Sequence, residues 1–169
     1  ALNTYMEKES GWDEAHFLKE SQYFDVWRYD YKLYRDIINF AREHSLQIVG
    51  LNLDREIVSQ IFREGSTDGL EESDVKSLPA KRDLTLPGYA RRLKQMYSTH
   101  KMGGHGSGSF AGFIQSQAMW DETMAHHVVQ YLKANPNKKL IVLAGSQHTR
   151  KDSGIPPRVL RQLRLNQVS

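Results

Sequence analysis

The 169-residue chain contains no cysteine, no long apolar run and little excess of charge of either sign. Without cysteine, structural disulfides and thiolate metal sites are both excluded. The longest apolar run, residues 140–144, is far too short for a transmembrane helix. The first ten residues have neither a basic start nor an apolar stretch, so we expect no signal peptide within them.

The charge balance is nearly even, because 23 basic and 20 acidic residues give a formal net charge of +3. A nucleic-acid-binding surface normally shows a basic stripe, whereas most basic residues here alternate with acidic ones. The exception is residues 158–164, where a solvent-facing helix explains three arginines better than a phosphate-binding face. With 39% hydrophobic residues, the composition is that of a globular protein. We therefore expect a single domain over residues 1–169 and no nucleic-acid partner.

Helices are predicted along most of the chain by apolar residues at helical spacing. Asp13 and Asp54 are expected to cap the helices that follow them, and Gly65 is expected to end the second. The longest helix is expected over residues 109–134. Further helices are expected at residues 2–9, 30–44, 71–76, 89–100 and 157–163.

Two short apolar runs, residues 46–51 and 139–144, contain β-branched residues and follow helix ends, which predicts buried strands. Residues 165–168 resemble the start of a third strand. Helices that alternate with strands through short connections favour an α/β fold. We therefore expect a small parallel sheet flanked by helices, helix-rich overall, with a mainly helical insertion over about residues 66–108.

Two groups of residues could bind a metal or move a proton. His148 follows a predicted strand in the sequence GSQH, and the carboxyl ends of strands commonly carry ligand-binding groups. A loop histidine bonded only to the backbone explains it equally well. On the long helix, Gln117 and Asp121 share one face, as do Glu122 and His126. The second pair could hold one metal ion, although an ordinary surface ion pair is the commoner reason for such spacing.

A third group lies in a glycine-rich stretch near the middle of the chain. Tyrosine, histidine and methionine are all axial haem ligands, and a lysine can pair with a haem propionate. A flexible, glycine-rich loop would also admit a large flat ligand. The alternative is a solvated connection whose histidines bind nothing. The residues of this group are Tyr97, His100, Lys101, Met102 and His105.

Four segments together resemble a known family: residues 27–43, 48–58, 109–132 and 142–160. The long helix reads F-x-x-F-x-x-x-Q-x-x-W-D-E-x-M-A, and the last segment carries G-x-x-H followed by G-I-P. In this order, the motifs resemble the ChaN-like haem-binding uptake family of the Tiki superfamily. The resemblance covers nearly all of the chain.

This resemblance implies an α/β domain with a parallel sheet, in a bacterial protein of iron or haem acquisition. Members are outer-membrane lipoproteins or periplasmic proteins, so an outer-membrane haem receptor is an expected partner. The resemblance also implies haem held at a homodimer interface. By position and residue type, Tyr97 would bind the iron, and His100 and Lys101 would hold propionates from the other subunit. His105 is a further candidate for cofactor contact.

The wider superfamily also includes metal-dependent peptidases built on two G-x-x-H motifs and a glutamate, and His148 matches the second motif. The family's first strand, with its G-E-x-H motif, and the next strand, with its acidic residue, have no counterpart in this sequence. We therefore expect any hydrolytic site to be incomplete and favour non-enzymatic haem binding. The alternative is a metal-dependent hydrolase that uses His148 with Asp121 and Glu122.

Overall fold

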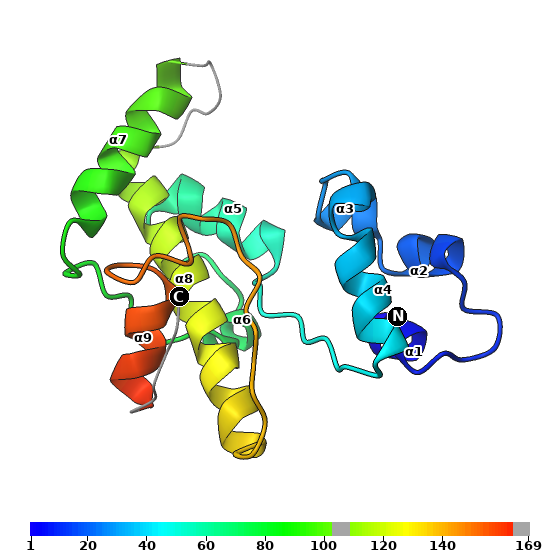
Figure 1. Ribbon diagram of the computed structural model, residues 1–169. Helices are drawn as coiled ribbons and strands as arrows, with labels where there is room; N and C mark the ends of the chain where they lie inside the picture. The colour runs from blue at the N-terminus through cyan, green and yellow to red at the C-terminus, as the bar shows by residue number, and fades with distance from the viewer. Residues whose placement is uncertain (103–108, 164–169) are drawn as a thin grey trace. The chain divides into compact units, whose positions relative to one another are not determined.

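The computed structural model describes residues 1–102 and 109–163, which form helices joined by loops and extended segments (Figure 1). The chain divides into two compact units, Ala1–Gly50 and Leu51–Ser169. None of the described helices combines the length and the apolar character that crossing a membrane requires. The single domain expected over residues 1–169 stays a prediction.

Side-chain capping explains where two elements of the first unit begin. Asp13 accepts a hydrogen bond from the His16 N–H at 2.8 Å and thereby begins a helix, as predicted. The helix predicted over residues 30–44 is divided, because the Asp30 carboxylate accepts from the Lys32 N–H at 3.0 Å and closes a tighter turn. The elements are α1 (Leu2–Met6), α2 (Glu14–Glu20), α3 (Tyr23–Val26), the 3₁₀ turn η1 (Tyr31–Leu33) and α4 (Arg35–Glu43).

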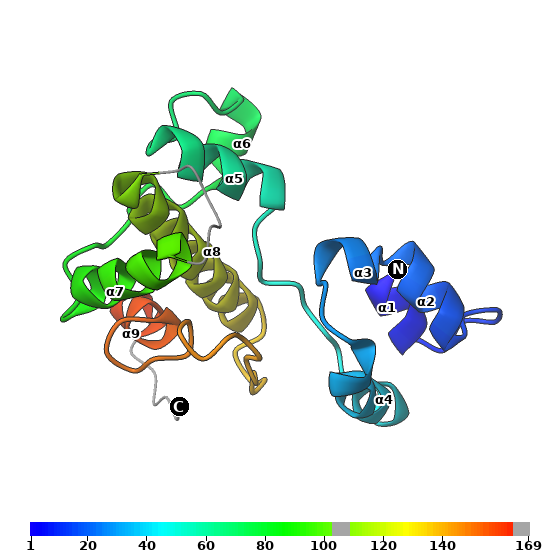
Figure 2. The same ribbon diagram turned by 90° about the horizontal axis from the view of Figure 1, so that it is seen from above.

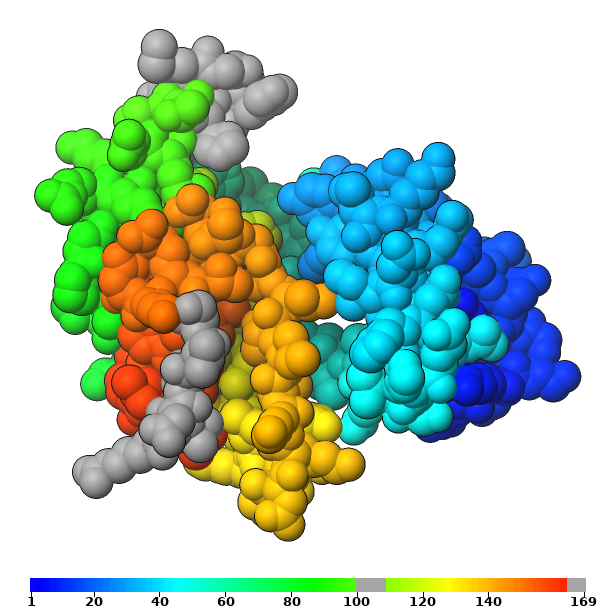
Figure 3. All heavy atoms as spheres, viewed as in Figure 1, coloured from blue at the N-terminus to red at the C-terminus, as the bar shows by residue number. Residues whose placement is uncertain are grey.

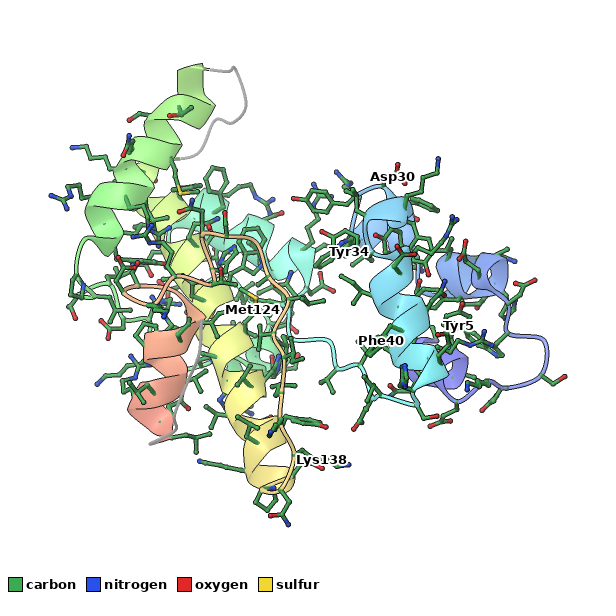
Figure 4. All side chains as sticks on the ribbon, in the orientation of Figure 1. Tyr5, Asp30, Tyr34, Phe40, Met124 and Lys138 are labelled. Atoms are coloured by element: carbon green, nitrogen blue, oxygen red, sulfur yellow. The ribbon has the colours of Figure 1, made fainter. Side chains whose placement is uncertain are left out.

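Aromatic packing forms the core of the first unit. Tyr5, labelled in Figure 4, stacks on Phe17 with ring centroids 4.5 Å apart. Arg42 of α4 donates hydrogen bonds to the carbonyls of Tyr5 and Trp12, and its guanidinium lies 4.3 Å from the Tyr5 ring. Burial is also the main reason why the pKa of Tyr31 is raised to about 12. The buried residues are Tyr5, Met6, Phe17, Tyr31 and Ala41.

The second unit is arranged around one long helix, α8 (Phe110–Ala134). α5 (Arg55–Glu64), α7 (Tyr89–Met102) and α9 (Ile155–Gln162) each pack against α8, and Figure 2 shows α5 and α9 on different sides of it. The short helix α6 (Glu72–Ser77) precedes α7. One core cluster joins α8 to α9, and a second joins it to α7. The cluster between α8 and α9 contains Met124 (labelled in Figure 4), Ala125, Val128, Val129, Ile155 and Val159. The cluster between α8 and α7 contains Tyr89, Leu93, Ile114 and Ala118.

The predicted ends of the α5 helix are confirmed. Asp54 accepts a hydrogen bond from the Glu56 N–H at 2.8 Å, and Gly65 ends the helix with φ of 76°, in the left-handed region that glycine tolerates. Ser109 caps α8 by accepting from the Gly112 N–H at 3.0 Å. Local side-chain chemistry therefore fixes these boundaries.

The predicted α/β fold with a parallel sheet is wrong, because residues 1–102 and 109–163 contain no β-strand. Residues 139–144 are extended and lie at the surface (Figure 3). Leu140 and Val142 pack against the core, whereas the alternate side chains of Ile141 and Leu143 are 86% and 56% exposed. This is the side-chain alternation of a strand. A strand also needs a neighbour for its backbone N–H and C=O groups, and no described segment pairs with this one.

The other predicted strand, residues 46–51, is an extended connection between the two units. Ile48 packs against the core of the first unit, and Leu51 packs against the core of the second. The apolar residues of this connection therefore pack against the cores of the two units and, within the described residues, do not pair in a sheet. The third predicted strand, residues 165–168, lies outside the described residues. Within the insertion predicted over residues 66–108, the described part holds α6 and α7.

Gly112 allows α8 to approach α5 closely, and this contact can be tested. A Cβ at position 112 would overlap with the Phe62 carbonyl oxygen of α5. Alanine is the better helix former by about 1 kcal/mol, yet we expect Gly112→Ala to destabilise the protein by about 1–3 kcal/mol through overpacking. Urea unfolding followed by circular dichroism measures this change. Gly50→Ala is the control, because a Cβ there meets nothing within 4 Å. A Gly112→Ala protein as stable as the wild type would contradict the close approach.

Candidate functional site

Three consecutive polar residues are buried in the middle of α8. Asp121, Glu122 and Thr123 are each no more than 2% exposed. Burying an ionised carboxylate is costly unless cations or hydrogen-bond donors surround it. The segments that pack around this part of α8 must therefore supply such partners.

Arg158 of α9 supplies the main partner and is itself completely buried. Its Nε donates to Glu122 Oε1 at 3.1 Å. Its Nη1 donates to the backbone carbonyls of Ser153 and Gly154, and its Nη2 donates to the carbonyl of Asp83 at 3.0 Å. One guanidinium thus ties α8 to the start of α9 and to the segment that precedes α7.

The rest of the Glu122 carboxylate is also occupied. Its Oε2 accepts from Arg161 Nη2 at 2.7 Å, and Oε1 accepts from the Asp83 N–H at 3.0 Å. His126, considered above as its metal-binding companion, lies with its Nε2 2.7 Å from the side-chain nitrogen of Gln130. The structure therefore pairs Glu122 with arginines and places His126 in a separate contact on α8.

Asp121 lies 3.9 Å from Arg158 Nη1 through its Oδ2, but its hydrogen-bond partners are other residues, and among them is the predicted residue His148. Its Oδ1 lies 2.7 Å from His148 Nδ1, and its Oδ2 accepts from the Tyr89 hydroxyl at 2.8 Å. The His148 side chain is 21% exposed and meets the Trp120 ring edge-on at 6.0 Å. A carboxylate on Nδ1 orients an imidazole in the way seen behind many metal-binding histidines. Burial is the main cause that raises the pKa of Tyr89 above its ordinary value, and the charge of Asp121 raises it further.

The G-x-x-H and G-I-P motifs shape the loop that holds His148. The His148 N–H donates to the Gly145 carbonyl at 2.8 Å, and the His148 carbonyl accepts from the Ile155 N–H at 2.7 Å. A Cβ at Gly154 would overlap with that same carbonyl, so only glycine fits there. The motifs therefore fix the position of this imidazole through backbone contacts.

Tyr97, the predicted iron ligand, belongs to a group of half-buried aromatic side chains. Its ring lies 5.7 Å from Phe110 and 5.5 Å from Phe113, and Phe113 lies 6.4 Å from Phe62. We call Phe62, Tyr97, Phe110 and Phe113 the aromatic cluster. It joins α5, α7 and α8, and each of its members retains partial exposure.

The other residues predicted to contact haem lie at or beyond the end of α7. The backbone of His100 and Lys101 continues α7, but their side chains are not described, and His105 lies outside the described residues. Within the described part of the chain, no group of three or more histidine, aspartate or glutamate side chains is arranged to hold a metal ion. Metal binding by His148 therefore stays a prediction.

Sequence reasoning missed Arg158. The arginines of residues 158–164 were expected on a solvent-facing helix, and for Arg158 this interpretation is wrong because the side chain is fully buried. A signal was present in the sequence: Asp121 and Glu122 stand in the middle of a long helix rich in apolar residues. A buried acidic pair of that kind requires a cation from elsewhere in the chain.

Comparison with known families adds the biological class. A model that describes haem-binding uptake proteins matches residues 1–159 and so covers α8, α9 up to Val159, and Tyr97. The chain belongs to the ChaN family of the Tiki superfamily, and the resemblance noted in the sequence is confirmed. No curated protein and no solved structure matches the chain.

Asp83 provides a pH-dependent test of the arginine network. Hydrogen bonds from Thr85, followed by the charge of Arg161, lower the pKa of Asp83 below its ordinary value. The stability that this carboxylate contributes is therefore present above the unfolded pKa of about 4 and is lost as pH falls through the folded pKa. We expect Asp83→Asn to cost about 0.5–1 kcal/mol at pH 7, with the difference from wild type shrinking below about pH 4.

Urea unfolding measured from pH 7 down to about pH 3 checks this expectation. Asp68→Asn is the control, because Asp68 is exposed and forms no ion pair within the described residues. A stability difference for Asp83→Asn that stays constant across this range, or grows at low pH, would contradict the assignment.

Proposed function

We propose that this protein binds haem in bacterial iron uptake and that Tyr97 supplies a phenolate ligand to the ferric iron. Membership of the haem-binding uptake family supports the ligand class. The observation that carries the choice of residue is the position of Tyr97 in the half-buried aromatic cluster.

The chemistry of the aromatic cluster fits a porphyrin. A tyrosine oxygen is an established axial ligand of haem iron. The neighbouring Phe110 and Phe113 rings offer apolar, flat contact area of the kind that a porphyrin face requires. Covering such a face stabilises the complex by about 25 cal/mol for each Å² of apolar surface removed from water.

A second copy of the chain would complete the site. A porphyrin has two large apolar faces. Because the aromatic cluster lies beside Tyr97, one chain would cover only the face to which Tyr97 binds. We therefore propose a homodimer in which the other face is covered by the second copy. His100 and Lys101 of the partner subunit would then hold the propionates, with His105 as a further contact.

The proposed function also implies where in the cell the protein acts and which protein donates haem to it. Uptake of haem by a bacterium requires its passage through the cell envelope, so we propose that the protein acts there, in the periplasm or as an outer-membrane lipoprotein. An outer-membrane haem receptor is the expected donor. The family description supports uptake, and these finer statements rest on it.

Tyr97→Phe tests the ligand, because it removes the oxygen and keeps the ring that packs on Phe110 and Phe113. We expect wild-type protein titrated with ferric haem to develop a Soret band and to sediment as a dimer. Tyr97→Phe should keep its fold but shift the ferric spectrum and weaken haem binding by about tenfold or more, as expected for loss of an axial ligand.

Tyr131→Phe is the matched control, since Tyr131 lies near the other end of α8, and it should bind haem as the wild type does. An unchanged spectrum in Tyr97→Phe, together with loss of binding in His100→Ala or His105→Ala, would assign the ligand to a histidine. A monomer at saturating haem would contradict the dimer.

A further inference from the structure

A cavity of about 400 Å³ lies between one face of α7 and the loop that follows residues 139–144. The cavity is lined by four residues of α7 and two of the loop. They are Arg92, Gln95, Met96, Thr99, Gln147 and Arg150.

This cavity is separate from the aromatic cluster. The four α7 residues follow the i, i+3, i+4, i+7 pattern and so share one face of the helix. Tyr97 is rotated by about 100° from Met96 around a helix of 3.6 residues per turn, and its ring packs on Phe110 and Phe113 of α8. A ligand of the cavity would therefore lie on a different side of α7 from the proposed haem ligand.

Arg92 brings an uncompensated positive charge to the cavity wall. Its Nη1 donates to Gln147 Oε1 at 2.9 Å and contacts Met96 Sδ at 3.9 Å, and its Nη2 donates to Ser153 Oγ at 3.3 Å. Its Nε is buried and has no hydrogen-bond acceptor within the described residues. No carboxylate of the described residues forms an ion pair with it, and its guanidinium lies 5.3 Å from the Tyr89 ring.

The other arginines of this region differ from Arg92 because carboxylates neutralise them. Arg158 and Arg161 both bind Glu122. Arg150, on the opposite wall of the cavity, forms a two-pronged ion pair with Asp152 at 2.7 and 3.0 Å. The cavity therefore carries the net positive charge of Arg92, with further hydrogen-bonding groups from Gln95, Thr99 and Gln147 around it.

We propose that this cavity binds a small organic anion through a carboxylate or phosphate group held by Arg92. A guanidinium binds both groups through charge-assisted hydrogen bonds, and a partly buried cation without an acid gains most from such a partner. Met96 supplies an apolar contact, and the volume exceeds what a bare phosphate needs. This site is additional to haem binding and does not depend on it.

The test is a titration of the haem-free full chain by ¹H–¹⁵N NMR, with inorganic phosphate in one arm and citrate in the other, at constant pH and ionic strength. We expect saturable shifts at the amides of Arg92, Gln95, Thr99 and Gln147 with at least one probe. Arg92→Gln should weaken binding about tenfold or more, the usual consequence of losing a charge-assisted hydrogen bond. Arg91→Gln is the matched control, because Arg91 is exposed and does not line the cavity.

The two arms also separate the ligand classes. A response to phosphate alone indicates a phosphate ester, and a response to citrate alone indicates a carboxylate. Met96→Trp, which fills the cavity and keeps both arginines, should abolish binding and provides a second variant if Arg92→Gln folds poorly.

The proposal is overturned if neither probe gives saturable shifts up to about 10 mM, tenfold above a millimolar Kd. It is equally overturned if Arg91→Gln weakens binding as much as Arg92→Gln does, or if the shifts map elsewhere. Because the titration uses haem-free protein, its failure leaves the haem proposal untouched, and failure of haem binding leaves this one untouched.

Discussion

Two adjacent carboxylates buried in the middle of α8 impose the arrangement of the second unit. Glu122 binds Arg158 and Arg161, while Asp121 faces His148 and the Tyr89 hydroxyl. An unpaired charge at this depth would cost several kcal/mol. The partners come from α7, α9 and the loop between residues 145 and 154, so satisfying the two carboxylates brings these segments together.

The orientation of α7 links this constraint to both proposed binding sites. Tyr89, at the start of α7, is held by Asp121, and Leu93, one turn later, is buried against α8. With the helix fixed at that end, Tyr97 lies against the aromatic side chains of α8. On another face of the same helix, Arg92 lines the cavity beside Gln147. A buried polar contact thus positions the residues of both proposed binding sites.

The features that sequence reasoning predicted correctly depend on neighbouring residues. Asp13, Asp54 and Gly65 act within one helical turn, so their roles can be recognised locally. Residues 139–144 alternate as a strand does, but the pattern reports only that one face is buried, whereas a sheet requires a distant partner. The burial of Arg158 depends in the same way on Glu122, 36 residues earlier. Tyr97 was considered first for its residue type beside a glycine-rich stretch, and the family resemblance then suggested its role as iron ligand, which stays a prediction.

The most direct test of this account is a double-mutant cycle on the buried ion pair, with Arg158→Met, Glu122→Leu and the double variant compared in urea unfolding. If the pair organises the second unit, each single variant removes a main partner from a buried charge and should lose about 3 kcal/mol, even though Arg161 still binds Glu122 in Arg158→Met. The double variant should then be more stable than the sum of the two losses predicts, by about 2 kcal/mol or more. Two small, additive losses would contradict the central role of this ion pair.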